Sequence, residues 1–177
     1  SRGEKWDGPD PRDLTAETFE MIVETTREII DAVKPTRAAY TLETMPWMYP
    51  DSTESYLELI KAVDRPAMGV HFDPVNIICS PQRYFVNADL IREFCRTLGP
   101  RIRCVHAKDI LLGDRLTTHL DEVRPGRGAL CYRTLLGEVD RLDADMPVLL
   151  EHLNSEAEYD AAAGHIREVA GELGVET

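Results

Sequence analysis

Met68-Gly69-Val70-His71-Phe72-Asp73-Pro74 is the stretch that decides the fold, because it is a short strand-forming run closed by a proline. An amphipathic segment precedes it and begins near Ser52, with apolar residues at helical spacing: Tyr56, Leu57, Ile60 and Val63. A strand-forming run next to an amphipathic helix is typical of a strand in a parallel sheet covered by helices. The stretch therefore indicates an α/β protein.

The same alternation of strands and helices extends in both directions along the chain. We predict further strands at 38–43, 102–109 and 147–151, and further helices at about 15–33, 87–98, 135–142 and 155–173. Asn87 is the expected N-cap of the helix at 87–98, and Ser155 with Glu158 is the pattern of a capping box. Four alternations of strand and helix predict a parallel sheet with right-handed crossovers.

Two architectures fit four such units: a doubly wound sheet and part of a (β/α)₈ TIM barrel. A dinucleotide-binding doubly wound sheet has a glycine-rich turn directly after a strand. Gly126 and Gly128 follow a long charged loop instead. We therefore predict a single domain over residues 1–177 that supplies strands 5–8 of a TIM barrel. A complete barrel has about 250 residues, so we expect its N-terminal half to be absent from this sequence.

Composition and charge narrow the class of protein and its partners. Hydrophobic residues make up 43% of the 177 residues and charged residues 29%, which is typical of a folded globular domain. The net charge of -12 disfavours nucleic acid, and no apolar run is long enough for a membrane span. Four cysteines without C-x-x-C spacing favour a reducing compartment. We expect a cytoplasmic homo-oligomer that binds a small molecule, with no nucleic-acid or membrane partner.

Each of the four predicted strands ends in or next to a residue type that binds metal ions. These residues are Glu43, Asp73, His106 and Glu151, separated by 30, 33 and 45 residues. Single acidic residues at strand ends are usually helix caps or solvated, but four successive strands with this ending favour a shared site. Parallel barrel strands all end at one face, where these side chains would meet. Three carboxylates and an imidazole favour Mn²⁺ or Mg²⁺, with Co²⁺ and Zn²⁺ as alternatives.

The motifs around these residues resemble a known superfamily. They are Tyr40-Thr41-Leu42-Glu43, Gly69-Val70-His71-Phe72-Asp73, Val105-His106-Ala107-Lys108-Asp109, Pro125-Gly126-Arg127-Gly128 and Leu149-Leu150-Glu151. Their order and spacing resemble the xylose-isomerase-like sugar phosphate isomerase/epimerase superfamily of TIM barrels, which includes ketose 3-epimerases and inosose dehydratases. The resemblance implies that Glu43, Asp73, His106 and Glu151 are the metal ligands. It also implies that Glu43 and Glu151 act as acid and base on opposite faces of the substrate.

Three further residues are candidates for substrate binding. His71 lies two positions before Asp73, so both side chains point to the same side of the strand. Asn76 stands where epimerases of the superfamily usually carry a substrate-binding histidine. Arg115 takes the part of an arginine that would fall near Leu112. We assign no catalytic role to the Lys108 side chain, and loop capping is the expected use of Asp109.

The combined prediction is a divalent-metal-dependent isomerase or epimerase acting on a sugar, cyclitol or sugar-like polyol. It would transfer protons through an enediolate that the metal stabilises. A lyase or dehydratase on the same scaffold is the near alternative, because the same groups can expel a hydroxyl. Two other classes are a nuclease related to the apurinic endonucleases and a non-catalytic sugar-binding module. Five histidines and a net charge of -12 argue against the nuclease.

Overall fold

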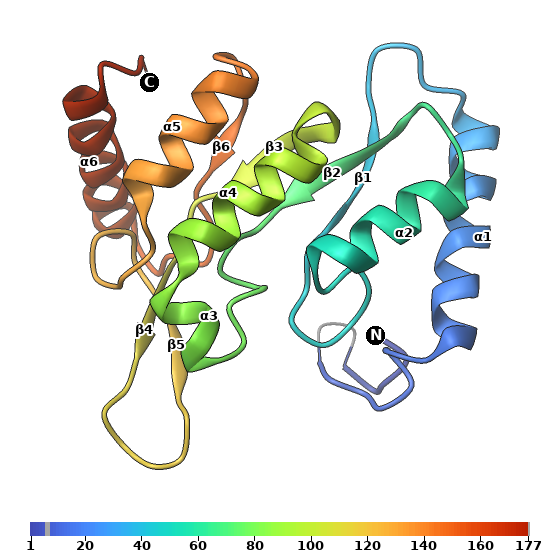
Figure 1. The fold of residues 1–177 in the computed structure, drawn as a ribbon, viewed down its shortest axis with the longest axis horizontal. Helices are drawn as coiled ribbons and strands as arrows, with labels where there is room; N and C mark the ends of the chain where they lie inside the picture. The colour runs from blue at the N-terminus through green and yellow to red at the C-terminus, as the bar shows by residue number, and fades with distance from the viewer. Residues whose placement is uncertain (6–7, 177) are drawn as a thin grey trace.

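The computed structural model describes residues 1–5 and 8–176 and contains one parallel sheet and one hairpin in that range (Figure 1). The sheet has the strand order β1-β2-β3-β6, and its neighbouring strands are parallel. Its strands are β1 (Tyr40–Glu43), β2 (Met68–Phe72), β3 (Ile102–His106) and β6 (Val148–Leu149). The hairpin pairs β4 (Asp109–Leu112) with β5 (Leu120–Val123) in antiparallel register.

One helix precedes the first parallel strand, helices follow every parallel strand, and the long helices pack against one another in sequence order. They are α1 (Ala16–Val33), α2 (Thr53–Val63), α3 (Pro81–Phe85), α4 (Asn87–Leu98), α5 (Tyr132–Leu142) and α6 (Glu156–Leu173), with the 3₁₀ helix η1 at Gly99–Arg101. Helix α1 packs on α2, α2 on α4, α4 on α5 and α5 on α6. The four predicted strand–helix units are therefore present as an arc of strands backed by an arc of helices.

The hydrophobic core lies between the sheet and the helices and fixes which way the strand side chains point. Phe72 on β2 stacks on Phe94 of α4, with ring centroids 3.9 Å apart. Tyr56 on α2 packs edge-on against the same ring, and its hydroxyl donates to the carbonyl of Leu42 at 2.5 Å. Because strand side chains alternate, the inward packing of Phe72 turns its neighbours His71 and Asp73 towards the opposite face of the sheet.

Two predicted helix caps differ from the structure. Asn87 lies within α4 and does not cap it; its side chain donates to the carbonyls of Tyr84 and Ala129 and accepts from the Cys131 amide. This prediction was wrong because the side chain connects α4 to the loop before α5. Ser155 does cap α6 by accepting from the Glu158 amide, but the Glu158 carboxylate pairs with Arg124 at 2.9 Å.

The segment after β3 differs most from the prediction. The strand predicted at 102–109 ends at His106, and the hairpin that begins at Asp109 occupies the charged segment that we expected to be a loop. The hairpin, drawn in yellow, projects from the body of the molecule (Figure 1). Helix α3 was also not predicted, although Ser80 caps it and Pro81 occupies its first turn. The strands of the hairpin have four residues each and α3 has five, so neither element is long enough for the apolar periodicity on which the prediction depended.

Candidate metal centre

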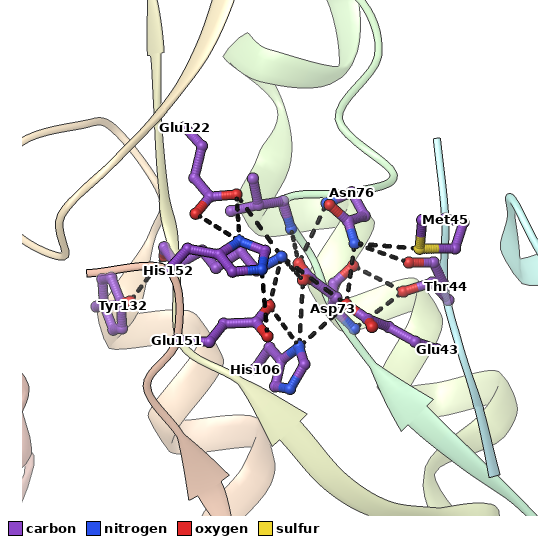
Figure 2. Close-up of polar contacts among 12 residues, drawn as sticks. Glu43, Thr44, Met45, Asp73, Asn76, His106, Glu122, Tyr132, Glu151 and His152 are labelled. Carbon is purple, nitrogen blue, oxygen red and sulfur yellow. Dashed lines mark hydrogen bonds and ion pairs between the residues drawn. The ribbon is translucent and has the colours of Figure 1, made fainter. Parts of the chain in front are cut away.

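The four candidate ligands come together at the carboxyl ends of the parallel strands, as Figure 2 shows. Glu43 is the last residue of β1, Asp73 directly follows β2, His106 is the last residue of β3, and Glu151 lies two positions after the end of β6. One potential ligand atom from each of them lies within 4.8 Å of the other three. Residues up to 108 positions apart therefore share one small site.

The spacing of these atoms suits a single ion. His106 Nδ1 lies 2.8 Å from Glu151 Oε1, 3.0 Å from Glu43 Oε1 and 3.5 Å from Asp73 Oδ2. An ion bound at about 2.1 Å separates neighbouring ligand atoms by about 3.0 to 3.4 Å in octahedral or tetrahedral geometry. Donors of this kind at these separations fit a hard or borderline divalent cation.

Asp73 is held by hydrogen bonds that leave one of its oxygens directed at the centre. Its Oδ1 accepts from the backbone amides of Val75 and Asn76 at 2.9 and 3.1 Å. The buried Thr44 hydroxyl donates to the Asp73 carbonyl at 2.8 Å and accepts from the Asp73 amide at 2.9 Å. These bonds tie the ends of β1 and β2 together, and Oδ2 remains for a cation.

Of the three residues predicted to bind substrate, the structure places two in the cluster. Asn76 Nδ2 donates to Glu43 Oε1 at 3.1 Å and to the Thr44 carbonyl at 3.0 Å, so it orients Glu43. The His71 ring packs edge-on against His106 at 4.0 Å, and burial followed by the His106 charge lowers the pKa of His71. Arg115 lies outside the cluster, in the exposed tip of the hairpin.

Lys108 is the most buried of the charged site residues to which the sequence analysis gave no role. Its side chain is 2% exposed, and its Nζ lies 2.9 Å from Asp73 Oδ2 and 2.5 Å from Glu151 Oε1. Its distances to Glu122 Oε2 and Glu43 Oε1 are 3.6 and 3.8 Å. The signal was present in the sequence, because a residue two positions after His106 points to the same side of an extended chain.

Asp109 fixes the backbone next to Lys108, as expected for a loop cap. Its Oδ2 accepts from the amides of Gly126 and Gly128, and its Oδ1 accepts from Leu130, all at 2.9 Å. A side chain at Gly128 would lie 2.3 Å from the Ile110 carbonyl oxygen, so only glycine fits this turn. The Pro-Gly-Arg-Gly segment thus wraps around the Asp109 carboxylate.

Two residues at the mouth extend the cluster towards the hairpin. His152 Nδ1 lies 3.1 Å from Glu122 Oε1, and its Nε2 lies 3.7 Å from Glu151 Oε2. Glu122 belongs to β5, so the hairpin contributes a carboxylate to the mouth of the site (Figure 2). Sequence reasoning missed both residues, because the pairing of β5 with β4 was not predicted.

The carboxylates control the protonation of the two basic groups. Burial alone would lower the pKa of His106, but contacts with Asp73 and Glu43 and the charge of Glu151 raise it to about 9. Burial also opposes the charge of Lys108, yet Asp73 and Glu151 raise its pKa above the ordinary value. Burial would raise the pKa of Asp73, but His106 and Lys108 together bring it below its usual value.

Two carboxylate oxygens of the cluster indicate whether these residues fit a metal ion. Asp73 Oδ2 and Glu151 Oε1 are buried and accept no hydrogen bond of ordinary geometry, although Lys108 lies close to both. Buried carboxylate oxygens without well-formed hydrogen bonds are costly, and an ammonium shared among three carboxylates offsets this cost only in part. The donor set and these two oxygens therefore fit a divalent ion.

Parallel strand–helix units with polar groups gathered at the carboxyl ends of the strands define the chain as part of a (β/α)₈ barrel. The profile of the xylose isomerase-like TIM barrel family matches residues 2–169. The chain belongs to this family, and the predicted fold class is confirmed. A comparison of the sequence with the curated proteins finds no match.

Several solved structures resemble the chain. The probable 3-DHS dehydratase AsbF from Bacillus anthracis has a TM-score of 0.68 at 23% identity, over 89% of this chain and 58% of its own. A xylose isomerase-like TIM barrel protein from Mycobacterium smegmatis in complex with magnesium has a TM-score of 0.68 at 18% sequence identity, over 93% of this chain and 52% of its own. D-psicose 3-epimerase from Clostridium cellulolyticum has a TM-score of 0.63 at 15% sequence identity, over 90% of this chain and 60% of its own. The chain thus spans somewhat more than half the length of these barrels.

No helix in the described part of the chain is both long and apolar enough to cross a membrane.

Proposed function

We propose that this chain carries the metal centre of a divalent-metal-dependent isomerase or epimerase that acts on a neutral sugar, cyclitol or related polyol. The observation that carries the proposal is the convergence of Glu43, Asp73, His106 and Glu151 within 4.8 Å. The similar structures include sugar epimerases and a dehydratase, which supports an enzyme of this kind.

The exposure of the ligands divides them into two kinds. The side chains of Asp73 and His106 are 0% and 9% exposed, whereas those of Glu43 and Glu151 are 29% and 24% exposed. Glu43 and Glu151 also come from the two outer strands of the sheet, with the two buried ligands between them. A substrate at the mouth would therefore meet the two glutamates, which supports their roles as acid and base.

The reaction requires one proton to leave a carbon next to a carbonyl and another to return. A bound divalent ion would supply positive charge that stabilises the enediolate. One of Glu43 and Glu151 takes the proton as its carboxylate, and the other delivers a proton to the opposite face. Asn76 keeps Glu43 in place through its 3.1 Å hydrogen bond, and Lys108 lies against Glu151.

The charge of the site favours a neutral substrate and a hard cation. Glu43, Asp73, Glu151 and the nearby Glu122 bring four carboxylates to the mouth, against Lys108 and His106. An anionic group such as a phosphate would be repelled there, whereas hydroxyl and carbonyl oxygens can approach a cation. We propose Mn²⁺ or Mg²⁺ as the ion, with Co²⁺ and Zn²⁺ as alternatives, because oxygen donors dominate the set.

A dehydratase is the second candidate, favoured by the likeness to a probable dehydratase and by Lys108, whose ammonium lies 2.5 Å from Glu151. In that reaction one carboxylate takes the proton from carbon, the hydroxyl on the neighbouring carbon leaves as water with a proton from the other glutamic acid, and a C=C double bond forms. A non-catalytic sugar-binding module is the remaining alternative.

One experiment separates these functions. The metal-loaded protein is incubated with a panel of sugars and cyclitols in deuterated water, and the products are followed by mass and NMR. An isomerase or epimerase incorporates deuterium at a carbon without loss of water, and a dehydratase loses water. Binding of a panel member without either change supports the module and contradicts both enzymatic proposals. The proposed enzyme also loses turnover when the ion is removed by a chelator and regains it when Mn²⁺ is restored.

A further inference from the structure

The most unusual group in the site is a buried ammonium that contacts the same carboxylates as the proposed metal ion. Lys108 Nζ lies 2.9 Å from Asp73 Oδ2 and 2.5 Å from Glu151 Oε1. His106 Nδ1 lies 3.5 and 2.8 Å from these same two oxygens. Lys108 Nζ, His106 Nδ1 and the expected position of the ion therefore all lie next to the same two oxygens, Asp73 Oδ2 and Glu151 Oε1. Neither oxygen accepts a hydrogen bond of ordinary geometry.

We propose that Lys108 is the internal counter-ion of the metal centre. In the metal-free protein its ammonium holds Asp73 and Glu151 together, and it competes with the incoming divalent cation for Asp73 Oδ2 and Glu151 Oε1. This inference rests on the proposed metal centre and adds a residue that sets how tightly the centre binds its ion.

Lys108 has this role because three negatively charged carboxylates lie close together in the site. Glu43, Asp73 and Glu151 place carboxylate oxygens within 4.8 Å of one another, where they repel strongly in a partly buried site. The ammonium lies within 4 Å of all three carboxylates and offsets this repulsion. A divalent ion at the same oxygens is attracted by the carboxylates but repelled by the ammonium, so Lys108 lowers its affinity.

When an ion binds, the Lys108 side chain can move away from the two oxygens while its backbone stays fixed. The Tyr132 hydroxyl donates to the Lys108 carbonyl at 2.7 Å, and the next residue, Asp109, is bound by the glycine loop. The side chain itself is a flexible stem. Glu122 Oε2, 3.6 Å from Nζ and 35% exposed at the mouth, is the carboxylate that keeps the displaced ammonium partnered.

The test compares Lys108→Met, which keeps a long unbranched side chain without charge, with the wild-type protein. The matched control is Arg127→Met, which removes one exposed positive charge of the nearby glycine loop. Calorimetric titration with Mn²⁺ is expected to show binding at least about tenfold tighter in Lys108→Met and a change under about twofold in the control. Without metal, Lys108→Met is expected to melt several degrees lower than wild type, and saturating Mn²⁺ is expected to narrow or reverse this difference.

The outcomes distinguish the counter-ion role of Lys108 from the existence of the metal centre itself. A folded Lys108→Met variant whose Mn²⁺ affinity equals or falls below that of wild type overturns the counter-ion role and leaves the metal centre intact. If the variant folds only with Mn²⁺ present, the ion has replaced the missing charge, as the proposal requires. A variant that stays unfolded in saturating Mn²⁺ shows a structural role and overturns the proposal. If folded wild-type protein binds neither Mn²⁺ nor Mg²⁺, the metal centre itself is wrong.

Discussion

The two sides of the site are held in different ways. The Asp73 arm, which comprises Glu43, Thr44, Asp73 and Asn76, is held by hydrogen bonds from a hydroxyl, an amide side chain and backbone amides. The Glu151 arm, which comprises Lys108, Glu122, Glu151 and His152, is joined by contacts between charged or titratable groups. The first arm belongs to paired strands β1 and β2, and the second to the two-residue strand β6 and the hairpin.

This difference has a physical consequence. Hydrogen bonds from neutral donors such as Thr44 and Asn76 depend little on salt, whereas contacts between partly exposed charged groups weaken as the salt concentration rises or as one partner loses its charge. We therefore expect the Asp73 arm to keep its geometry under most conditions and the Glu151 arm to respond to metal, salt and pH. The predictions below probe the two arms in order of decreasing effect.

Glu151→Gln is expected to have the largest effect. It removes the charge of a proposed acid or base but little volume, so turnover should fall by about 10²- to 10⁴-fold while the protein remains folded. Steady-state kinetics and circular dichroism measure the two properties. Glu168→Gln on the exposed face of α6 is the matched control and should keep wild-type turnover. Activity within a few-fold of wild type in Glu151→Gln would refute the two-carboxylate scheme.

Thr44→Val tests the Asp73 arm. The hydroxyl makes two buried hydrogen bonds with the Asp73 backbone, so its loss should lower the free energy of unfolding by about 1–3 kcal/mol. Mn²⁺ affinity should also fall by about tenfold, because the supported ligand loses its fixed position. Chemical denaturation and titration measure these changes. Thr41→Val on β1, three positions earlier, is the control, and equal effects in the two variants would show that Thr44 has no special role.

Proton release on metal binding tests the state of His106. At pH 7 its pKa of about 9 keeps the imidazole protonated in the metal-free protein, but a metal ligand must be neutral. Binding of Mn²⁺ should therefore release about one proton at pH 7, and the release should decline as the pH rises through about 9. Calorimetry in buffers of different ionisation enthalpy measures this number. No release at pH 7 would mean that His106 is already neutral there or does not bind the ion.

His152→Asn is expected to have the smallest effect, confined to the Glu151 arm. Asparagine tolerates the left-handed backbone at this position, where φ is 58°, but loses the imidazole contacts with Glu122 and Glu151. The apparent kcat/KM should fall by about two- to fivefold at low salt, with a smaller loss at high salt because exposed charges are screened. A loss that is the same at both salt concentrations would contradict an electrostatic role for His152.

The sequence was sufficient to predict the parallel units and the four ligand candidates because both follow from periodic rules. Apolar spacing identified the long helices, and strand ends in a parallel barrel share one face. Predicting that Glu43 and Glu151 lie close together required no knowledge of how the loops fold. That they bind an ion and move protons stays a prediction.

The hairpin and its residues required information that periodicity does not contain. The segment from Asp109 to Val123 is charged and short, so its antiparallel pairing was not apparent, and Glu122 could not be placed at the mouth. The end of β3 was placed three residues too late, and Lys108 received no role. Asn87 was assigned to the wrong task because its partners, Ala129 and Cys131, lie more than 40 residues away.

The central claim is that four distant side chains bind one divalent cation, and crystals soaked in Mn²⁺ test it most directly through anomalous scattering at the manganese edge. The account predicts one strong peak within about 2.0–2.3 Å of a carboxylate oxygen of Glu43, Asp73 and Glu151 and of His106 Nδ1. A peak bound to other residues, or no peak at these four at saturating Mn²⁺, would contradict it.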